Sequence, residues 1–328
     1  MTTATLSSPK IKMSVIGPIV ALVVLIILGA LMNPNFLSAG NISNVLSRSA
    51  FIGIIAVGMT FVITAGGLDL SVGSMAAFIA GLMILVMNTA LPVMGIGIPI
   101  VLLGMAVALA AGLFAGLLNG VLITRLGMDA FIVTLGSMGI YRSLVTWLAD
   151  GGTLSLDFSL RTFYQPVYYG GIFGISWPII VFTIVVICGE LLMRSTAFGR
   201  HCAAIGSNDQ VARYSSVRVA RVRMLTYVML GILVGIATIM YVPRLGSASS
   251  ATGLLWELEA IAAVIVGGTA LKGGFGRVWG TVIGVLILTL IGNILNLTDL
   301  VSPYLNGAIQ GAIIILAVVL QRGRKPGQ

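Results

Sequence analysis

Apolar runs of about 20 residues, the length that spans a bilayer, follow one another along almost the whole chain. Only 8% of the 328 residues are charged and 58% are hydrophobic, whereas a soluble domain carries about a quarter charged residues. A chain with so few charges cannot cover itself with water, so lipid must be its main solvent. This excludes a soluble enzyme, a disordered chain and a fibrous protein.

Ten apolar runs are candidates for helices that cross the membrane. They predict an all-α polytopic membrane protein of about ten transmembrane helices, with residues 1–328 forming a single transmembrane domain. The first run is longer than the apolar part of a signal peptide, and no small-residue cleavage site directly follows it, so we expect it to be retained. The runs cover residues 15–32, 45–66, 70–90, 96–124, 129–149, 171–193, 224–243, 256–271, 278–297 and 304–321.

The basic residues gather on alternate connections between these runs, which indicates the direction of each crossing. If the N-terminus is cytoplasmic, most of the 18 Lys and Arg residues fall in cytoplasmic segments, above all in the arginine-rich segment 194–223. The distribution therefore predicts cytoplasmic tails at 1–14 and 322–328, with a loop on the opposite side at 150–171. This sidedness accounts for the net charge of +9, and we expect no nucleic-acid partner.

Small residues recur at every fourth position in several runs. The longest series comprises Gly104, Ala108, Gly112, Gly116 and Gly120. Small residues at this spacing line one face of a helix and let another backbone approach closely. The pattern favours helix packing within one bundle, with a subunit interface as the alternative.

Two glycine-rich polar segments, 64–74 and 267–276, interrupt the apolar pattern. Non-helical backbone at membrane depth is tolerated only inside protein or along a water-filled cavity. Asp69 has two interpretations: a helix cap near the cytoplasmic surface, or the polar wall of a solute pathway, since acids within the membrane are costly. Intramembrane amides either hold helices together or bind a hydroxyl-rich solute, because an amide both donates and accepts hydrogen bonds. The candidate pathway residues are Thr64, Asp69, Ser71, Asn119 and Asn293.

The sequence lacks the motifs for nucleotide, metal or nucleophilic chemistry. Its one histidine, His201, and its two cysteines, Cys188 and Cys202, are too scattered for a zinc site or a histidine-based triad. Lys272 lacks the neighbouring Ser or Thr of a P-loop. We therefore expect no enzyme activity and no cofactor in this chain, so that any ATP would be bound by another subunit.

Three segments carry a family resemblance. They are GMTFVITAGGLDLSVGS at 58–74, AFGR with AIGSNDQVAR within 197–213, and GGTALKGGFGR followed by GT within 267–281. Together they closely resemble permease subunits of bacterial sugar ABC importers of the ribose/xylose/arabinose type. The resemblance extends from about Pro34 to Arg322. Ser207 and Ser216 stand where that family usually has glycine, which affects the local turns.

The resemblance implies a helical bundle of two inverted halves, some of whose helices are broken. The predicted directions agree, because the four helices from about residue 45 start outside and the four from 224 start inside. It also implies a multi-pass protein of the bacterial cytoplasmic (inner) membrane, with both termini cytoplasmic and the 150–171 loop periplasmic. This chain would be the permease domain that forms the translocation path for a monosaccharide.

The partners implied by the resemblance are a cytoplasmic ABC ATPase that binds ATP and magnesium, a periplasmic sugar-binding protein, and a second permease copy, identical or related. The 194–223 segment would hold the helix that couples the ATPase to the gates. We expect Asn208 or Asp209 to cap that helix, and Ala212 to be small because it packs against the ATPase. The candidate coupling residues are Gly206, Asn208, Asp209, Ala212 and Arg213.

An ion-coupled secondary transporter of a small polar solute is the alternative function. Broken helices and inverted halves also serve that class of protein. It would need buried carboxylates for a coupling ion, and the chain offers mainly Asp69 and Glu190.

Overall fold

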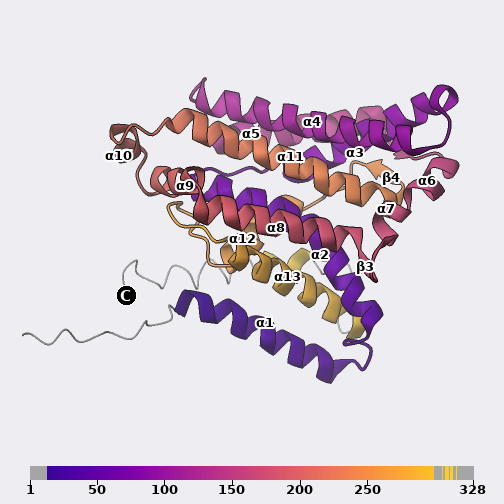
Figure 1. Cartoon of the computed structure of the whole chain (residues 1–328), viewed down its shortest axis with the longest axis horizontal. Coiled ribbons are helices and arrows are strands. Elements are labelled where there is room, and N and C mark those ends of the chain that lie inside the picture. Colours follow the sequence, from indigo (N-terminus) through magenta and orange to yellow (C-terminus); the bar gives the residue numbers. More distant parts are fainter. Residues whose placement is uncertain (1–12, 299–304, 306, 310, 313–314, 316–328) are drawn as a thin grey trace, which may run out of the picture.

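A computed structural model describes residues 13–298, 305, 307–309, 311–312 and 315. These residues form a helical bundle with two small two-stranded sheets (Figure 1). The elements are α1 (Met13–Met32), α2 (Ala39–Thr64), α3 (Val72–Met94), α4 (Ile98–Thr124), α5 (Ala130–Leu148), β1 (Thr153–Ser155), α6 (Phe158–Tyr164), α7 (Pro166–Tyr169), β2 (Gly171–Ile172), β3 (Ile175–Ser176), α8 (Trp177–Ser195), α9 (Ala197–Ser207), α10 (Asp209–Tyr214), α11 (Val219–Leu245), β4 (Ser247–Ser249), α12 (Trp256–Val266) and α13 (Val278–Thr298).

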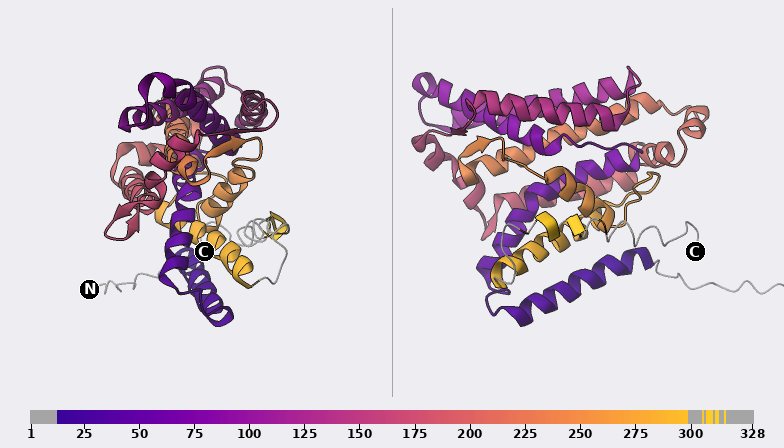
Figure 2. Two further views of the ribbon diagram at one scale, coloured as in Figure 1. Left: turned by 90° about the vertical axis from the view of Figure 1, so that its right-hand side faces the viewer. Right: turned by 180° about the vertical axis from the view of Figure 1, so that it is seen from behind.

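The long helices run roughly side by side, so the bundle has two distinct ends (Figures 1 and 2). One end carries α9 and α10 and is called the basic end, because the arginine-rich segment lies there. The other carries α6, α7 and β3 and is called the strand end. α2 runs through the middle and is buried almost continuously from Ser49 to Thr64. The all-α membrane fold predicted from the sequence is confirmed.

Seven helices of the described chain are long and apolar enough to cross a membrane, namely α2, α3, α4, α5, α8, α11 and α13. α1 adds a shorter apolar stretch over Gly17–Met32. The predicted run 304–321 lies mostly outside the described residues, as do the tails 1–12 and 322–328. The count of ten crossings therefore stays a prediction.

The predicted span 256–271 was too long. α12 has 11 residues and ends at Val266, because Gly267 caps it and Gly268 follows in a left-handed conformation with φ of 91°. At 1.5 Å per residue the helix covers about 16 Å, roughly half of a bilayer core. The predicted start of α8 at 171 was also early, since residues 171–176 form the β2–β3 hairpin and the helix begins at Trp177.

The two halves of the chain meet where α3 and α12 begin. Residues 65–71 precede α3 without helical structure, and β4 with the turn after it precedes α12. A Cβ atom added to Gly73 would lie 2.2 Å from the carbonyl oxygen of Gly253. The backbones therefore touch at this point, which only glycine permits.

Small residues pack the helices within this chain. α4 crosses α11 through Gly112 and Gly116 on one side and Gly231 and Gly235 on the other. A Cβ atom added to Gly231 would lie 2.1 Å from the carbonyl oxygen of Gly112. Close backbone contact of this kind maximises van der Waals packing between membrane helices. The interpretation of the glycine series as packing within one bundle is confirmed.

The strand end is stabilised by strand pairing and hydrogen bonds between segments that are distant in the sequence. β1 pairs antiparallel with β4, so that Leu154 lies opposite Ala248. Asn88 of α3 donates to the carbonyl oxygen of Ser155 (2.9 Å) and accepts from the N–H of Asp157 (2.9 Å). The phenolic O–H of the buried Tyr164 donates to the carbonyl oxygen of Ile239 (2.8 Å). These bonds close the connection between α5 and α8 over the ends of α3 and α11.

The position of Ser155 and Ser216 at opposite ends gives a test of sidedness. Both residues are exposed, so Ser155→Cys and Ser216→Cys should react with an impermeant thiol reagent from opposite sides of a membrane. The native Cys202 should not be labelled, because it is buried and burial raises the pKa of its thiol to about 12. Cys188 is exposed and is replaced by serine in both variants. Labelling of both positions from the same side would contradict the orientation predicted from the charges.

Candidate functional site

A buried polar network surrounds the break before α3. The carboxylate of Asp69, 1% exposed, accepts from the N–H of Ser71 (2.8 Å) and from its hydroxyl (2.6 Å). The side-chain amide of Asn119 donates to the other carboxylate oxygen (3.2 Å) and to the Ser71 hydroxyl (3.1 Å). Ser137 in turn donates to the Asn119 side-chain oxygen (2.7 Å). Three helices thus meet in one connected set of hydrogen bonds.

The network shows how Asp69 acts at the start of α3. The N-cap of α3 is Ser71, whose side chain makes no capping hydrogen bond. Asp69 instead bonds the N-cap residue itself and ties it to α4. The acid therefore holds the start of α3 in place from inside the bundle rather than at a water-exposed surface.

Thr64 lies at a second place, near the basic end. Its hydroxyl donates back to the Thr60 carbonyl oxygen (2.5 Å), and its own carbonyl oxygen accepts from the N–H of Gly274 (3.0 Å). A Cβ atom added to Gly206 of α9 would lie 2.0 Å from that same Thr64 oxygen and 2.4 Å from the Gly274 nitrogen. The end of α9 therefore packs between the two glycine-rich segments, 64–74 and 267–276.

Asn293 lies at a third place, near the strand end. Its amide and that of Asn41 bond each other in both directions, at 3.1 and 2.8 Å. This joins α2 to α13. The five residues predicted to line a pathway are therefore distributed over three sites, and their contact with a solute stays a prediction.

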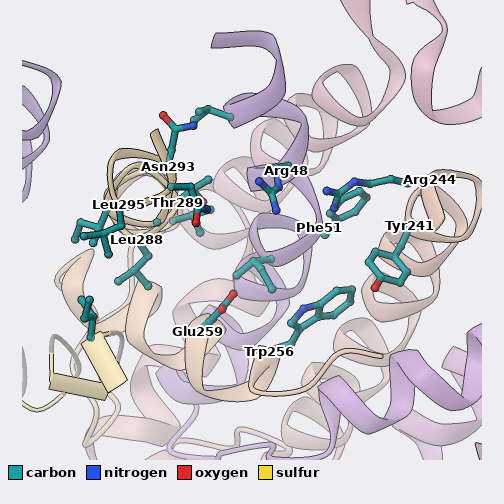
Figure 3. A pocket seen from close by; sticks show the side chains of 17 residues that line it. Arg48, Phe51, Tyr241, Arg244, Trp256, Glu259, Leu288, Thr289, Asn293 and Leu295 are labelled. Carbon is teal, nitrogen blue, oxygen red and sulfur yellow. The ribbon is translucent and has the colours of Figure 1, made fainter. Parts of the chain in front are cut away.

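A cavity of about 310 Å³ adjoins Asn293 and lies between α2, α11, α12 and α13 (Figure 3). Its lining combines three aromatic residues with charged and amide side chains. The lining residues are Val45, Arg48, Phe51, Ile52, Tyr241, Arg244, Trp256, Glu259, Val285, Leu288, Thr289, Ile291, Gly292, Asn293, Leu295, Asn296 and Ile309. Of these residues only Asn293 was predicted from the sequence to line a pathway, although Glu259 lies within the predicted run 256–271 and was an available signal.

The aromatic residues of the cavity contact one another. The rings of Phe51 and Trp256 are parallel within 2° with centroids 6.5 Å apart, and the Tyr241 ring meets Trp256 edge-on at 4.9 Å. The Arg244 guanidinium lies 5.9 Å from the centres of the Phe51 and Tyr168 rings, a distance at which a cation is attracted to an aromatic face. The arrangement fixes three rings and one cation on neighbouring parts of the wall.

The predicted coupling residues form a compact corner at the basic end. Asn208 caps α10, its side-chain oxygen accepting from the N–H of Val211 (3.1 Å), as the sequence predicted. Arg213 pairs with Asp209 one turn away (3.3 Å). Ala212, in contrast, is 2% exposed within its own chain. Its small size is therefore already required for the packing of α10, apart from any partner.

Two large side chains point outward from the same corner. Tyr214 is 88% exposed and Val211 is 57% exposed. The arginine-rich pattern of this segment contains no separate signal for these two residues. Exposed aromatic and aliphatic residues next to charged ones are typical of protein contacts.

Residues 41–318 match the family model described as the permease component of the branched-chain amino acid transport system. The chain belongs to this family. It is thus a multi-pass membrane permease component.

Relatives within the permease family match almost end to end. The ribose import permease protein RbsC of Bacillus subtilis is 39% identical, over 94% of this chain and 93% of the relative. RbsC of Haemophilus influenzae is 37% identical, over 92% and 90%. The xylose transport system permease protein XylH of the same species is 30% identical, over 88% and 91%.

A solved structure supports the fold at low sequence identity. It is an ABC transporter assigned to the metal-chelate type and captured in an inward-facing conformation. Its chain superimposes with a TM-score of 0.54 at 12% identity, covering 93% of this chain and 98% of the other. The likeness concerns the fold alone.

Proposed function

We propose that this chain is the membrane subunit of an ABC importer and forms the translocation path for a monosaccharide. The observation that carries the proposal is the match to ribose import permeases over more than 90% of this chain. The cavity of Figure 3 supports it, because aromatic faces and hydrogen-bonding side chains together suit a small polyhydroxylated solute.

The partners in this proposal bind opposite ends of the bundle. A cytoplasmic ATPase, which holds ATP and magnesium, docks on α9 and α10 at the basic end. A periplasmic sugar-binding protein docks at the strand end, and a second permease copy, identical or related, completes the membrane part. The chain then lies in the bacterial inner membrane with both termini in the cytoplasm, as the positive-inside rule favours.

The contacts of α9 suggest how the ATPase moves the gates. Gly206 touches the end of α2 at Thr64 and the 267–277 loop at Gly273 and Gly274. The first of these segments leads into α3 and the second lies between α12 and α13, so one break lies in each half of the chain. A shift of α9 therefore reaches both breaks through backbone contacts, and it can bias the two states of the path differently.

Reconstituted transport tests the proposed function. Proteoliposomes that contain this chain, its ATPase and its binding protein should accumulate ribose, xylose or galactose only when ATP and the binding protein are present. Uptake that needs neither of them but follows an ion gradient would establish the secondary transporter instead. Glu190, the second acid on which that alternative relied, is paired with Arg194 at 2.6 Å.

The exposed residues of α10 give a prediction for coupling. Tyr214→Ala should leave the amount of folded protein unchanged but weaken co-purification of the ATPase and lower ATP-driven uptake, because Tyr214 is 88% exposed. Aromatic residues at the centre of an interface often contribute about 2 kcal/mol or more to binding. The control is Tyr169→Ala at the strand end, since Tyr169 is 64% exposed. Full ATPase association and full uptake in Tyr214→Ala would contradict this assignment.

Ala212→Trp should behave differently from Tyr214→Ala. Ala212 is buried against its own chain, so an indole there overpacks the corner of α9, α10 and α11 at a cost of about 1–3 kcal/mol. We expect a lower thermal unfolding midpoint even when the ATPase is absent. An unchanged midpoint together with lost ATPase binding would show that Ala212 contacts the partner directly.

A further inference from the structure

The β2–β3 hairpin at the strand end carries an apolar tip that the described chain leaves uncovered. Ile172 is 46% exposed, Ile175 is 49% exposed, and Phe173, at the turn, is 100% exposed. Apolar side chains that are exposed next to one another mark a surface that contacts a partner or a membrane. Packing within the described chain therefore does not account for this tip.

The backbone of the turn makes the phenylalanine more unusual. Phe173 and Gly174 form a two-residue turn in which their φ angles are 53° and 79°. A turn of this kind favours asparagine, aspartate or glycine, because a bulky side chain is disfavoured at positive φ. Phe173 opposes this local preference and is fully exposed, so an aromatic side chain is favourable here only if something outside the chain binds it.

The chain around the hairpin is uncharged over a long stretch. Residues 162–189 contain no Asp, Glu, Lys or Arg, and they run through the hairpin into α8, which is long and apolar enough to cross a membrane. Ile184 and Ile187 of α8 are 54% and 47% exposed, as expected of a helix that faces lipid. Trp177, the first residue of α8, is 37% exposed, and tryptophan is enriched at membrane–water interfaces. The apolar tip is therefore continuous with a helix surface suited to lipid, whereas the rim of a protein–protein interface is polar.

The backbone pairing of the hairpin determines how deep in a membrane it can lie. Its two short strands pair antiparallel, with Ile172 opposite Ile175, and the N–H of Trp177 donates to the carbonyl oxygen of Gly170 (3.0 Å). This pairing satisfies part of the backbone, but a two-stranded hairpin keeps open edges, which are not tolerated in the hydrocarbon core. The hairpin therefore suits the region of the headgroups and upper acyl chains.

The position of the hairpin in the bundle agrees with this depth. The hydroxyls of Ser176 and Ser47 share a hydrogen bond of 2.7 Å, which joins β3 to the first half of α2. In Figure 1, β3 lies beside the strand-end part of α2, whereas α6 lies farther out along the direction of the helices. The connection between α5 and α8 thus places α6, with its charged Arg161, farther from the bundle than the apolar hairpin.

We propose that the β2–β3 hairpin is a membrane-interface anchor. Ile172, Phe173 and Ile175 enter the headgroup and upper acyl region of the leaflet at the strand end, and α8 continues from Trp177 into the core. The partner is the phospholipid surface itself, bound through apolar contact. The anchor fixes the depth at which α8 begins, and through Ser176 it also holds the neighbouring part of α2. This contact does not depend on which solute the chain transports.

Fluorescence quenching at the tip tests the anchor. In a Cys188→Ser background, Phe173→Cys is labelled with a nitrobenzoxadiazole fluorophore and reconstituted into phosphatidylcholine vesicles, while the native Cys202 is buried. A lipid with a doxyl quencher near its headgroup should quench this label several-fold more strongly than a lipid with the quencher near the chain end. Iodide, present on both sides of the membrane, should quench it several-fold less than the same label on the exposed Thr162→Cys of α6. Equal access of iodide to both labels would overturn the proposal.

A charge at the tip tests the contribution of Phe173 itself. The label is placed on Ile175→Cys, which is also the second reporter of lipid contact, and Phe173→Asp is added. Aspartate fits the turn, but a charged side chain is costly in lipid, so iodide quenching at position 175 should rise several-fold. The matched control is Phe158→Asp on α6, because Phe158 is 83% exposed, and it should leave that quenching unchanged. No effect of Phe173→Asp, or equal effects of the two substitutions, would overturn the role given to the tip.

A protein partner at the tip is the rival interpretation, and the proposed binding protein would dock at this same end. If iodide quenches the label at position 173 freely in vesicles, and added binding protein removes that quenching, the tip is a docking surface for protein and the anchor is overturned. Quenching by the headgroup-level doxyl lipid without the binding protein supports the anchor. ATP-driven sugar uptake is measured separately, so failure of the anchor and failure of the proposed function are distinguishable.

Discussion

Asp69→Ala should sharply reduce the amount of folded protein in the membrane and abolish sugar uptake. The substitution removes the acceptor for the N–H and hydroxyl of Ser71 and for the amide of Asn119, all of which are buried. Removing the carboxylate also removes the free-energy cost of burying it, but the buried donors of Ser71 and Asn119 are left without their acceptor. A buried donor left without its acceptor costs about 1–3 kcal/mol, so we expect a total loss of about 2–5 kcal/mol.

The graded control for this prediction is Asp69→Asn. Its side-chain oxygen still accepts from Ser71, but its amide now faces the amide donor of Asn119, whose own oxygen already accepts from Ser137. We expect a smaller loss of stability than for Asp69→Ala, with Asp150→Asn, on the exposed connection after α5, close to wild type. The measurements are monodisperse yield after solubilisation, the thermal midpoint, and uptake. Wild-type values of all three in Asp69→Ala would exclude the network as a structural element.

Gly231→Leu should have an equally large effect, through packing instead of hydrogen bonding. The Cβ atom would lie 2.1 Å from the carbonyl oxygen of Gly112 and 2.9 Å from the backbone of Gly116. Backbone atoms of α4 cannot move aside as a flexible side chain could, so the two helices must separate along their crossing. We expect destabilisation of more than about 3 kcal/mol, above the usual cost of overpacking, seen as little or no folded protein.

The matched control is Gly139→Leu on α5. A Cβ atom added to Gly139 meets nothing within 4 Å, and leucine favours a helix over glycine by about 1 kcal/mol. The folded amount and thermal midpoint should therefore be unchanged or slightly higher. If Gly231→Leu is as well tolerated as Gly139→Leu, the close crossing of α4 and α11 is not needed for folding.

The sequence was sufficient for the features that depend on solvent and on local pattern. The shortage of charges identified lipid as the solvent, and the apolar runs located the long helices to within a few residues in most cases. The four-residue glycine spacing indicated close packing, since period alone decides which residues share a helix face. Asn208 was recognised as a cap because capping involves residues only three positions apart.

The same reasoning failed where a local pattern has two structural outcomes. The run 256–271 is apolar enough for a full crossing, yet α12 ends at Val266. The chain reaches α12 through β4 and the turn after it, and β4 is held by pairing with β1 almost a hundred residues earlier. A strand of three residues is too short to show a periodic pattern in the sequence. It forms because it pairs with another strand.

The candidate sites show most clearly which features depend on the sequence alone and which depend on the tertiary structure. Asp69 was singled out from the sequence because an acid between apolar runs is costly, but its role depends on Asn119 and Ser137, which α4 and α5 bring to it. The cavity was not foreseen, because Arg48 and Trp256 come from helices about two hundred residues apart in the chain. Composition and spacing determine which residues cannot face lipid, since that is a property of each side chain and its helix. Only the packing of the helices determines which of them share a chamber, because that depends on long-range contacts between backbones.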